Sequence, residues 1–181
     1  MKTGKVFRVY KAHDGREFTL RTPRWDDLDD LLEYINSLFT EGAMISINRL
    51  MTREKEAEWL GRHLTLIENG KRIAVVAEIN GKVVGQVGVN PRRGHSAHVG
   101  VIGIGLCQGY RDVGLGSELM IEAERLAKEQ GMTHMSLEVY SKNDRAQHVY
   151  RKLGYTYVGR EPDAINLNGE IMDNIYMYKK I

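Results

Sequence analysis

The segment from Arg111 to Gly116 holds the residues with the clearest chemical use. It reads R-D-V-G-L-G, follows a run rich in β-branched residues and precedes a helical pattern that begins at Leu115. The start of a helix offers unpaired N–H groups and a positive dipole end, and glycine lets an anion approach the backbone. The segment therefore predicts a phosphate-binding loop to which Arg111 adds charge, although two turn glycines after a strand give the same pattern.

A rival pattern of glycines lies just before this loop. Residues 103–109 read G-I-G-L-C-Q-G, whereas a dinucleotide fingerprint requires G-x-G-x-x-G at the opening of a helix and an acid about 20 residues further on. Here the glycines end before the helix begins, and the residue 20 positions beyond Gly109 is Glu129, inside a helical pattern. The spacing argues against a dinucleotide site.

A second spaced motif follows between residues 143 and 155. Asn143, Ala146, Tyr150, Gly154 and Tyr155 form N-x-x-A-x-x-x-Y-x-x-x-G-Y. Taken alone, Asn143 fits a helix cap and Tyr150 fits a core position. A phenol with a pKa near 10 stays protonated at neutral pH, so Tyr150 keeps its hydroxyl proton there.

The two motifs, in this order, resemble those of the GNAT superfamily of acetyl-CoA-dependent N-acetyltransferases over about residues 72–160. The resemblance implies one mixed α/β domain over residues 1–181, with a mostly antiparallel, splayed central sheet flanked by helices. It implies acetyl-CoA as co-substrate and direct attack of a primary amine on the thioester. It also implies a cofactor site formed by Ile104, Gly105, Leu106, Arg111, Asp112, Val113, Gly114, Leu115, Gly116, Ser117, Asn143 and Tyr150.

Within that resemblance, the roles differ along the site. The loop amides hold the pyrophosphate, the backbone of residues 104–106 pairs with pantetheine and supplies an oxyanion donor, Asn143 bonds the arm, and Tyr150 protonates the departing thiolate. Many family members place a glutamate 11 to 13 residues before the first motif, where this chain has His98, Val99 and Gly100.

The missing carboxylate leaves the general base open. His98 is the first candidate, because histidine titrates near neutrality, and Glu138 and Glu41 are weaker ones. A lysine-type amine is neutral only about 0.04% of the time at pH 7, whereas an α-amine pays a far smaller penalty. The sequence thus favours a low-pKa amine or a water relay.

Acceptor choice is assigned to residues 28–60 and to a loop over 161–174, with Glu33, Glu41 and Asp173 as candidate acids for a cationic amine. We expect a small metabolite or amino acid as acceptor. The alternatives are a protein N-terminus or lysine, and a non-catalytic sensor of acyl-CoA. A homodimer is possible. Cys107 is expected to be a buried thiol rather than a nucleophile, and the histidines have no metal-site spacing.

The elements that position these residues follow from hydrophobic periodicity and turn signals. The pattern predicts a hairpin over 6–20, helices from Trp25 and after Thr52, a hairpin over 73–89 around Asn80-Gly81, a strand over 98–107, a helix over 115–130 ended by Gly131, a strand over 135–140, a helix over 144–153, and strands over 155–159 and 175–178.

Composition limits the remaining function classes. The 181 residues include 26 Lys and Arg against 24 Asp and Glu, a net charge of +2, which is too small for a nucleic-acid-binding surface. No run is long and apolar enough to span a membrane, and the single cysteine excludes an internal disulfide. With no leader pattern at the N-terminus, these features predict a cytoplasmic protein.

Overall fold

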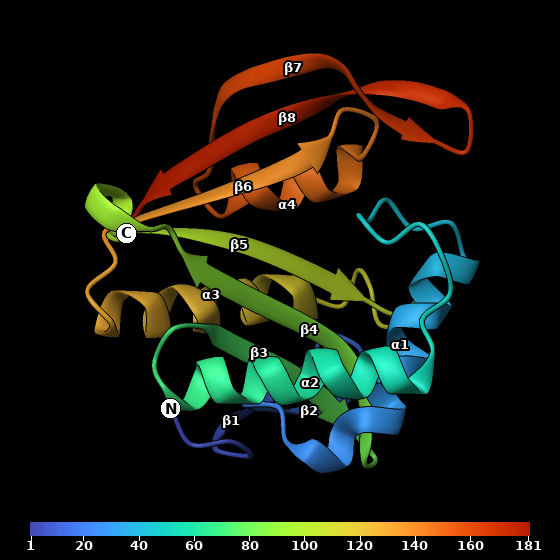
Figure 1. Cartoon of the computed structure of the whole chain (residues 1–181), viewed down its shortest axis with the longest axis vertical. Helices are drawn as coiled ribbons and strands as arrows, with labels where there is room; N and C mark the ends of the chain where they lie inside the picture. Colours follow the sequence, from blue (N-terminus) through green and yellow to red (C-terminus); the bar gives the residue numbers. More distant parts are fainter.

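One eight-stranded sheet runs through the molecule, with helices on both of its faces (Figure 1). The computed structural model describes residues 1–181. The strand order is β1-β2-β3-β4-β5-β6-β8-β7. Along the chain the elements are β1 (Val6–Lys11), β2 (Glu17–Arg21), α1 (Leu28–Thr40), α2 (Arg53–Glu68), β3 (Ile73–Ile79), β4 (Lys82–Pro91), β5 (Val99–Leu106), α3 (Leu115–Glu129), β6 (His134–Tyr140), α4 (Asp144–Lys152), β7 (Thr156–Leu167) and β8 (Glu170–Lys180).

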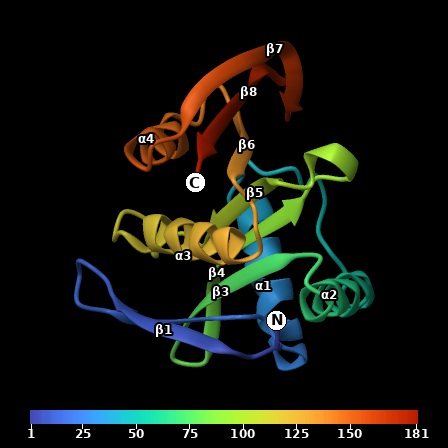
Figure 2. The same cartoon turned by 90° about the vertical axis from the view of Figure 1, so that its left-hand side faces the viewer.

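The helices divide into two layers. Figure 2 shows α3 and α4 on one side of the sheet and α2 on the other, where α1 also packs. Alternate strand residues bury against each layer, because successive side chains of a strand point to opposite faces. The larger core lies on the α3 side and the smaller one under α1 and α2. The mixed α/β architecture with a mostly antiparallel sheet is as predicted.

The sheet splits between its two central strands. β5 and β6 are the one parallel pair, and they pair only where Val99–Val101 lies beside His134–Ser136. Beyond this contact β5 stays paired with β4 as far as Leu106, while β6 stays paired with β8 as far as Tyr140. The two strands therefore diverge from Ile102 onward, which confirms the predicted splay.

The prediction of a loop over residues 161–174 is wrong, because this segment belongs to the long hairpin of β7 and β8. Its turn is Asn168-Gly169, with φ of 55° and 91°, the conformation that favours Asn-Gly in two-residue hairpins. The sequence predicted only the two ends of this hairpin as strands, over 155–159 and 175–178. Pro162 and Asp163 lie at an irregularity within β7, where the register shifts and Asp163 has φ 53°. A strand pair therefore borders this side of the molecule.

The remaining expected elements are present, with shifted ends. The first helix begins at Leu28, after a short 3-10 turn over Trp25–Asp27. Thr52 caps α2 by accepting from the Lys55 amide, and Gly131 follows α3 with φ 82°. None of the helices has the length and apolar character needed to cross a membrane.

Candidate functional site

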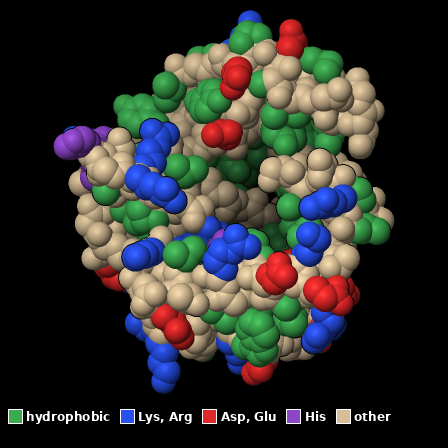
Figure 3. Space-filling model, viewed as in Figure 1, with side chains coloured by type: hydrophobic (Ala, Val, Ile, Leu, Met, Phe, Trp, Pro, Cys, Tyr) green, Lys and Arg blue, Asp and Glu red, His purple; other side chains and the backbone are tan.

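The divergence of β5 and β6 leaves one edge of β5 without a partner strand. Ile104, Gly105 and Leu106 pair on their other edge with residues 85–87 of β4. Unpaired strand edges readily add an extended ligand through main-chain hydrogen bonds. Figure 3 shows a hollow in the middle of the molecule, where Figure 1 places the gap between the two strands.

The predicted phosphate loop lies between β5 and α3. Gly114 is the N-cap of α3 and has φ 86°, a left-handed conformation that suits glycine. The amides of residues 115–117 precede the first intrahelical hydrogen bond, so they are free to bind an anion. The β1–β2 hairpin supports the loop from outside, because the Tyr10 hydroxyl and the His13 amide each donate to the Val113 carbonyl at 3.2 Å.

Arg111 is held in place rather than left as a free cation. It forms an ion pair with Glu41 beyond the end of α1, and its Nε donates to the Leu106 carbonyl at 2.8 Å. Burial lowers the pKa of Arg111. Arg145, on α4, is the more exposed cation at this loop and lies 3.6 Å from Asp112. The structure thus uses Arg111 to tie α1 to the end of β5.

Two of the three acids predicted to attract an amine, Glu33 and Glu41, line one cavity beside α1, whereas Asp173 lies apart from it. Glu41 is paired with Arg111, and Glu33 bonds Lys82 at 2.9 Å on the exposed side of α1. Asp173, on β8, lies 3.0 Å from Arg160. Each acid has a basic partner of its own, so none offers an uncompensated charge to a substrate.

The second motif lies on α4. Asn143 is the N-cap of this helix, and its side chain accepts from the Ala146 amide at 3.1 Å, which confirms the capping interpretation. Tyr150 is 9% exposed and packs in the larger core, with its ring 6.0 Å from that of Tyr155. Burial raises the pKa of Tyr150 to about 12. The phenol therefore carries its proton throughout the neutral range.

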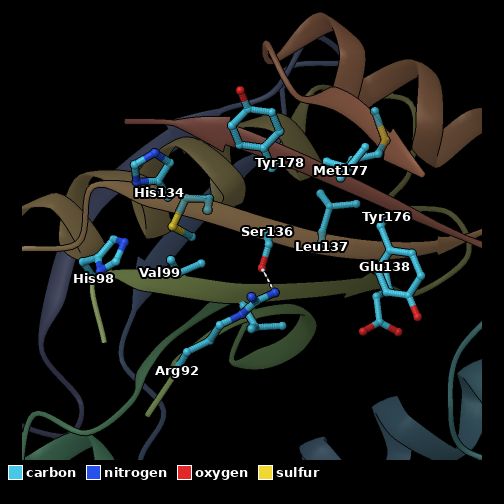
Figure 4. Close-up of a pocket in the computed structure, with 13 residues that line it drawn as sticks. Arg92, His98, Val99, His134, Ser136, Leu137, Glu138, Tyr176, Met177 and Tyr178 are labelled. Atoms are coloured by element: carbon cyan, nitrogen blue, oxygen red, sulfur yellow. Dashed lines mark hydrogen bonds between the residues drawn. The ribbon is translucent and has the colours of Figure 1, made fainter. Parts of the chain in front are cut away.

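A cavity of about 520 Å³ lies over β5, β6 and β8 (Figure 4). His98 is at the closed end of the split, where its ring lies 5.7 Å from that of His134. Seven strand positions separate His98 from Gly105, which corresponds to about 23 Å. The structure therefore does not bring His98 together with the free edge of β5 at residues 104–106.

Glu138 is better placed than His98 within the same cavity. It follows the last β6 residue that pairs with β5 by two positions, and so lies where the strands separate. The Asn174 side chain, buried on β8, donates to Glu138 Oε2 at 2.8 Å and fixes the carboxylate (Figure 4 shows Glu138 at the cavity). A carboxylate at this point can accept a proton from an amine bound in the cavity.

Comparison with known proteins decides the family. The profile described as the acetyltransferase (GNAT) family matches residues 29–155, which include the split, the phosphate loop and α4. The chain belongs to the GNAT acetyltransferase family. Its fold matches a GNAT acetyltransferase from Streptococcus pneumoniae with a TM-score of 0.81 and 26% identity, covering 91% of this chain and 99% of that one.

Two further relatives of this GNAT acetyltransferase have named acceptors. A phosphinothricin acetyltransferase from Sinorhizobium meliloti, solved in complex with AcCoA, matches with a TM-score of 0.80 and 22% identity over 91% of this chain and 88% of that one. A streptothricin acetyltransferase from Streptomyces lavendulae is 39% identical over 56 residues, which are 31% of this chain and 30% of the relative.

Sequence reasoning missed one residue of this acetyltransferase that contacts the free edge of β5. Tyr34, on α1, places its hydroxyl where a side chain on Gly105 would begin, so only glycine fits at that position of β5. Burial raises the pKa of Tyr34. Its spacing with Leu31 and Leu38 is that of an ordinary core position, and only the glycine opposite could have signalled the contact.

Cys107 follows the free edge directly. Its thiol lies 3.6 Å from the Ser37 hydroxyl, and burial raises the pKa of the thiol. A protonated thiol is a weak nucleophile, so the geometry offers no activated cysteine for a covalent intermediate.

Proposed function

We propose that this enzyme moves the acetyl group of acetyl-CoA to the primary amine of a small molecule. The observation that carries the proposal is the split between β5 and β6, which leaves an unpaired strand edge leading to the start of α3. An extended pantetheine arm fits such an edge, and a pyrophosphate fits the free amides of residues 115–117. The AcCoA complex of the Sinorhizobium meliloti relative supports the same choice of co-substrate.

The chemistry follows from groups on the two sides of the split. A neutral amine nitrogen attacks the thioester carbonyl, and a backbone amide of residues 104–106 donates to the developing oxyanion. The amine gives up a proton to Glu138, directly or through one water. The carbon–sulfur bond then breaks, and Tyr150 donates its proton to the departing sulfur. Before the next turnover Glu138 releases its proton to water and the Tyr150 phenolate takes one up from water. The products are an N-acetylated amine and CoA with a free thiol.

The proposed binding roles fall on the loop and on α4. Asp112, Val113 and Gly114 shape the approach to the amides of residues 115–117, and Arg145 adds positive charge beside them. We assign Asn143 to positioning the start of α4, because its side chain is occupied by the cap. Arg111 positions the end of β5 through its bond to the Leu106 carbonyl.

A small acceptor is favoured over a protein by the cavity beside the split. Its volume of about 520 Å³ suits a metabolite-sized ligand, and the β7–β8 hairpin borders it. The names of the Sinorhizobium and Streptomyces relatives, which specify phosphinothricin and streptothricin, point in the same direction.

Release of free CoA tests the proposal. The protein is incubated with acetyl-CoA and a panel of amino acids, polyamines, phosphinothricin, streptothricin and N-terminal peptides, and thiol release is compared with an amine-free control. We expect turnover with at least one small amine and none with peptides. Turnover with peptides alone would support a protein acetyltransferase, and acetyl-CoA binding without any turnover would support a sensor.

A further inference from the structure

The lining of the cavity beside the split carries a positive and a negative group. Figure 4 shows Arg92 beside Ser136, with His98 and His134 further toward the closed end of the split and Glu138 toward the open end. Val99 and Val101 line the cavity between them. In Figure 3, Asp and Glu side chains lie above the hollow, and Lys and Arg side chains lie on its left and right and below it, where further acidic side chains also lie.

Arg92 has no acidic partner. Its backbone amide bonds the Val99 carbonyl at 2.9 Å, and its guanidinium crosses β5 to donate one long hydrogen bond, 3.3 Å, to the Ser136 hydroxyl. No carboxylate lies within 4.0 Å of it, whereas Arg111 is paired with Glu41. The other N–H groups of the Arg92 fork are therefore available to an oxyanion, for which a guanidinium is geometrically suited.

The spacing of these groups along β6 is that of a short zwitterion. Ser136, which contacts Arg92, and Glu138 lie two residues apart on the same face of β6, so their Cα atoms are about 7 Å apart. Two hydrogen bonds of about 2.8 Å and the N–C–C backbone of an α-amino acid together span about 8 Å. A longer polyamine has no anionic group for the Arg92 end.

A second guanidinium without an acidic partner, that of Arg72, lies over β4 outside the lining of the cavity. Arg72 hydrogen-bonds only the Asn90 side chain, and its Nη2 lies 2.5 Å from where a Cβ on Gly88 would be. Gly103, the β5 residue opposite Gly88, has open space at the same point. Burial lowers the pKa of Arg72 to about 10, which still leaves it protonated at neutral pH.

We infer that the acceptor carries an acidic group beside its amine. The cavity binds an α-amino acid or a close analogue, with the amine at Glu138 and the carboxylate at Arg92, where Arg72 adds to the positive potential. This assignment rests on the proposed acetyl transfer to small amines.

The wild-type enzyme gives the first test. L-Methionine, L-phenylalanine and L-glutamate are each compared with their α-carboxamides for CoA release in the presence of acetyl-CoA. We expect kcat/KM to favour the acids by about 10- to 100-fold, the usual worth of a charged hydrogen-bond pair. Equal or better use of the amides would overturn the inference and leave the proposed function standing. No turnover with any amine would overturn both.

Substitution of Arg92 tests whether this residue causes the preference for acids over amides, and substitution of Arg93 is the matched control. Arg92→Met should raise KM for the acids about 10- to 100-fold and leave use of the amides within about twofold. Arg93→Met removes an exposed arginine whose side chain makes no ion pair and should change neither value. The rise in Tm caused by acetyl-CoA should be the same in both variants. An acid preference that survives in Arg92→Met would overturn the assignment.

Discussion

Replacing Tyr150 with phenylalanine isolates the proposed proton donor, because only the hydroxyl is lost. The ring packs against Tyr155 in the larger core, and the hydroxyl makes no hydrogen bond to the protein. The variant should therefore change the free energy of unfolding by less than about 1 kcal/mol. The rise in Tm on adding acetyl-CoA should also stay at the wild-type value.

Turnover should fall steeply in the same variant. With a pKa of about 12, only about one Tyr150 hydroxyl in 10⁵ is ionised at pH 7, so the proton is available to the departing sulfur. Loss of a general acid costs about 100-fold in rate, which equals about 2.7 kcal/mol in the activation free energy. The loss should fall on kcat rather than on KM for acetyl-CoA, because charge on sulfur develops only in the transition state.

The assay is CoA release between pH 6 and 9 with the best amine of the panel. Tyr157→Phe serves as control, because Tyr157 is 59% exposed on β7. Wild-type turnover by Tyr150→Phe across this range would refute the role of the hydroxyl and leave Tyr150 as a core residue.

The remaining predictions concern the loop, the base and the stability of the fold. Gly114→Val should lower both Tm and the affinity for acetyl-CoA, because Gly114 has φ 86° and the valine side chain would meet the Tyr10 hydroxyl and the His13 ring. Thermal unfolding with and without acetyl-CoA separates the two losses. Glu138→Gln should lower kcat, and part of the loss should be recovered at higher pH, where more of the amine is neutral. The kcat of His98→Ala should stay within about twofold of wild type. Equal pH–rate profiles for Glu138→Gln and wild type would exclude Glu138 as proton acceptor. Burial lowers the pKa of His63 to about 4, so the unfolded chain binds more protons below pH 6.5 and the free energy of unfolding falls as the pH drops from 6.5 toward 4. His63→Gln should reduce that fall in urea unfolding at pH 7.5 and 4.5.

Local patterns in the sequence were sufficient to predict the helices and the loop that position the site. The glycine at the start of α3 and the cap at Asn143 depend on residues within one turn, so their spacing is visible in the chain. The Asn80-Gly81 pair likewise predicts the β3–β4 hairpin. These features were predicted because each rests on short-range chemistry.

Pairings across the sheet were not predictable in the same way. Glu41 lies 70 residues from Arg111, and Asn174 lies 36 residues from Glu138, so only the register of the strands and the placement of α1 bring them together. The same holds for His98, whose residue type suggested a base but whose position on β5 takes it to the closed end of the split. Only the ends of the β7–β8 hairpin were predicted, over 155–159 and 175–178, because β7 continues through an irregularity between Glu161 and Ile165 that no local pattern signals.

The short contact between β5 and β6 also divides the sheet into two halves, each formed by a contiguous part of the chain. Strands β1 to β5 form antiparallel pairs within residues 6–106, and β6 to β8 form antiparallel pairs within residues 134–180. Three residue pairs of β5 and β6 connect the two half-sheets, and next to them the Thr133 and His134 amides donate to the His98 carbonyl. A pantetheine arm lying in the split would act as an added strand between the halves. Amide hydrogen exchange at residues 102–106 should therefore slow when acetyl-CoA binds. The bound co-substrate would then stabilise the sheet that binds it.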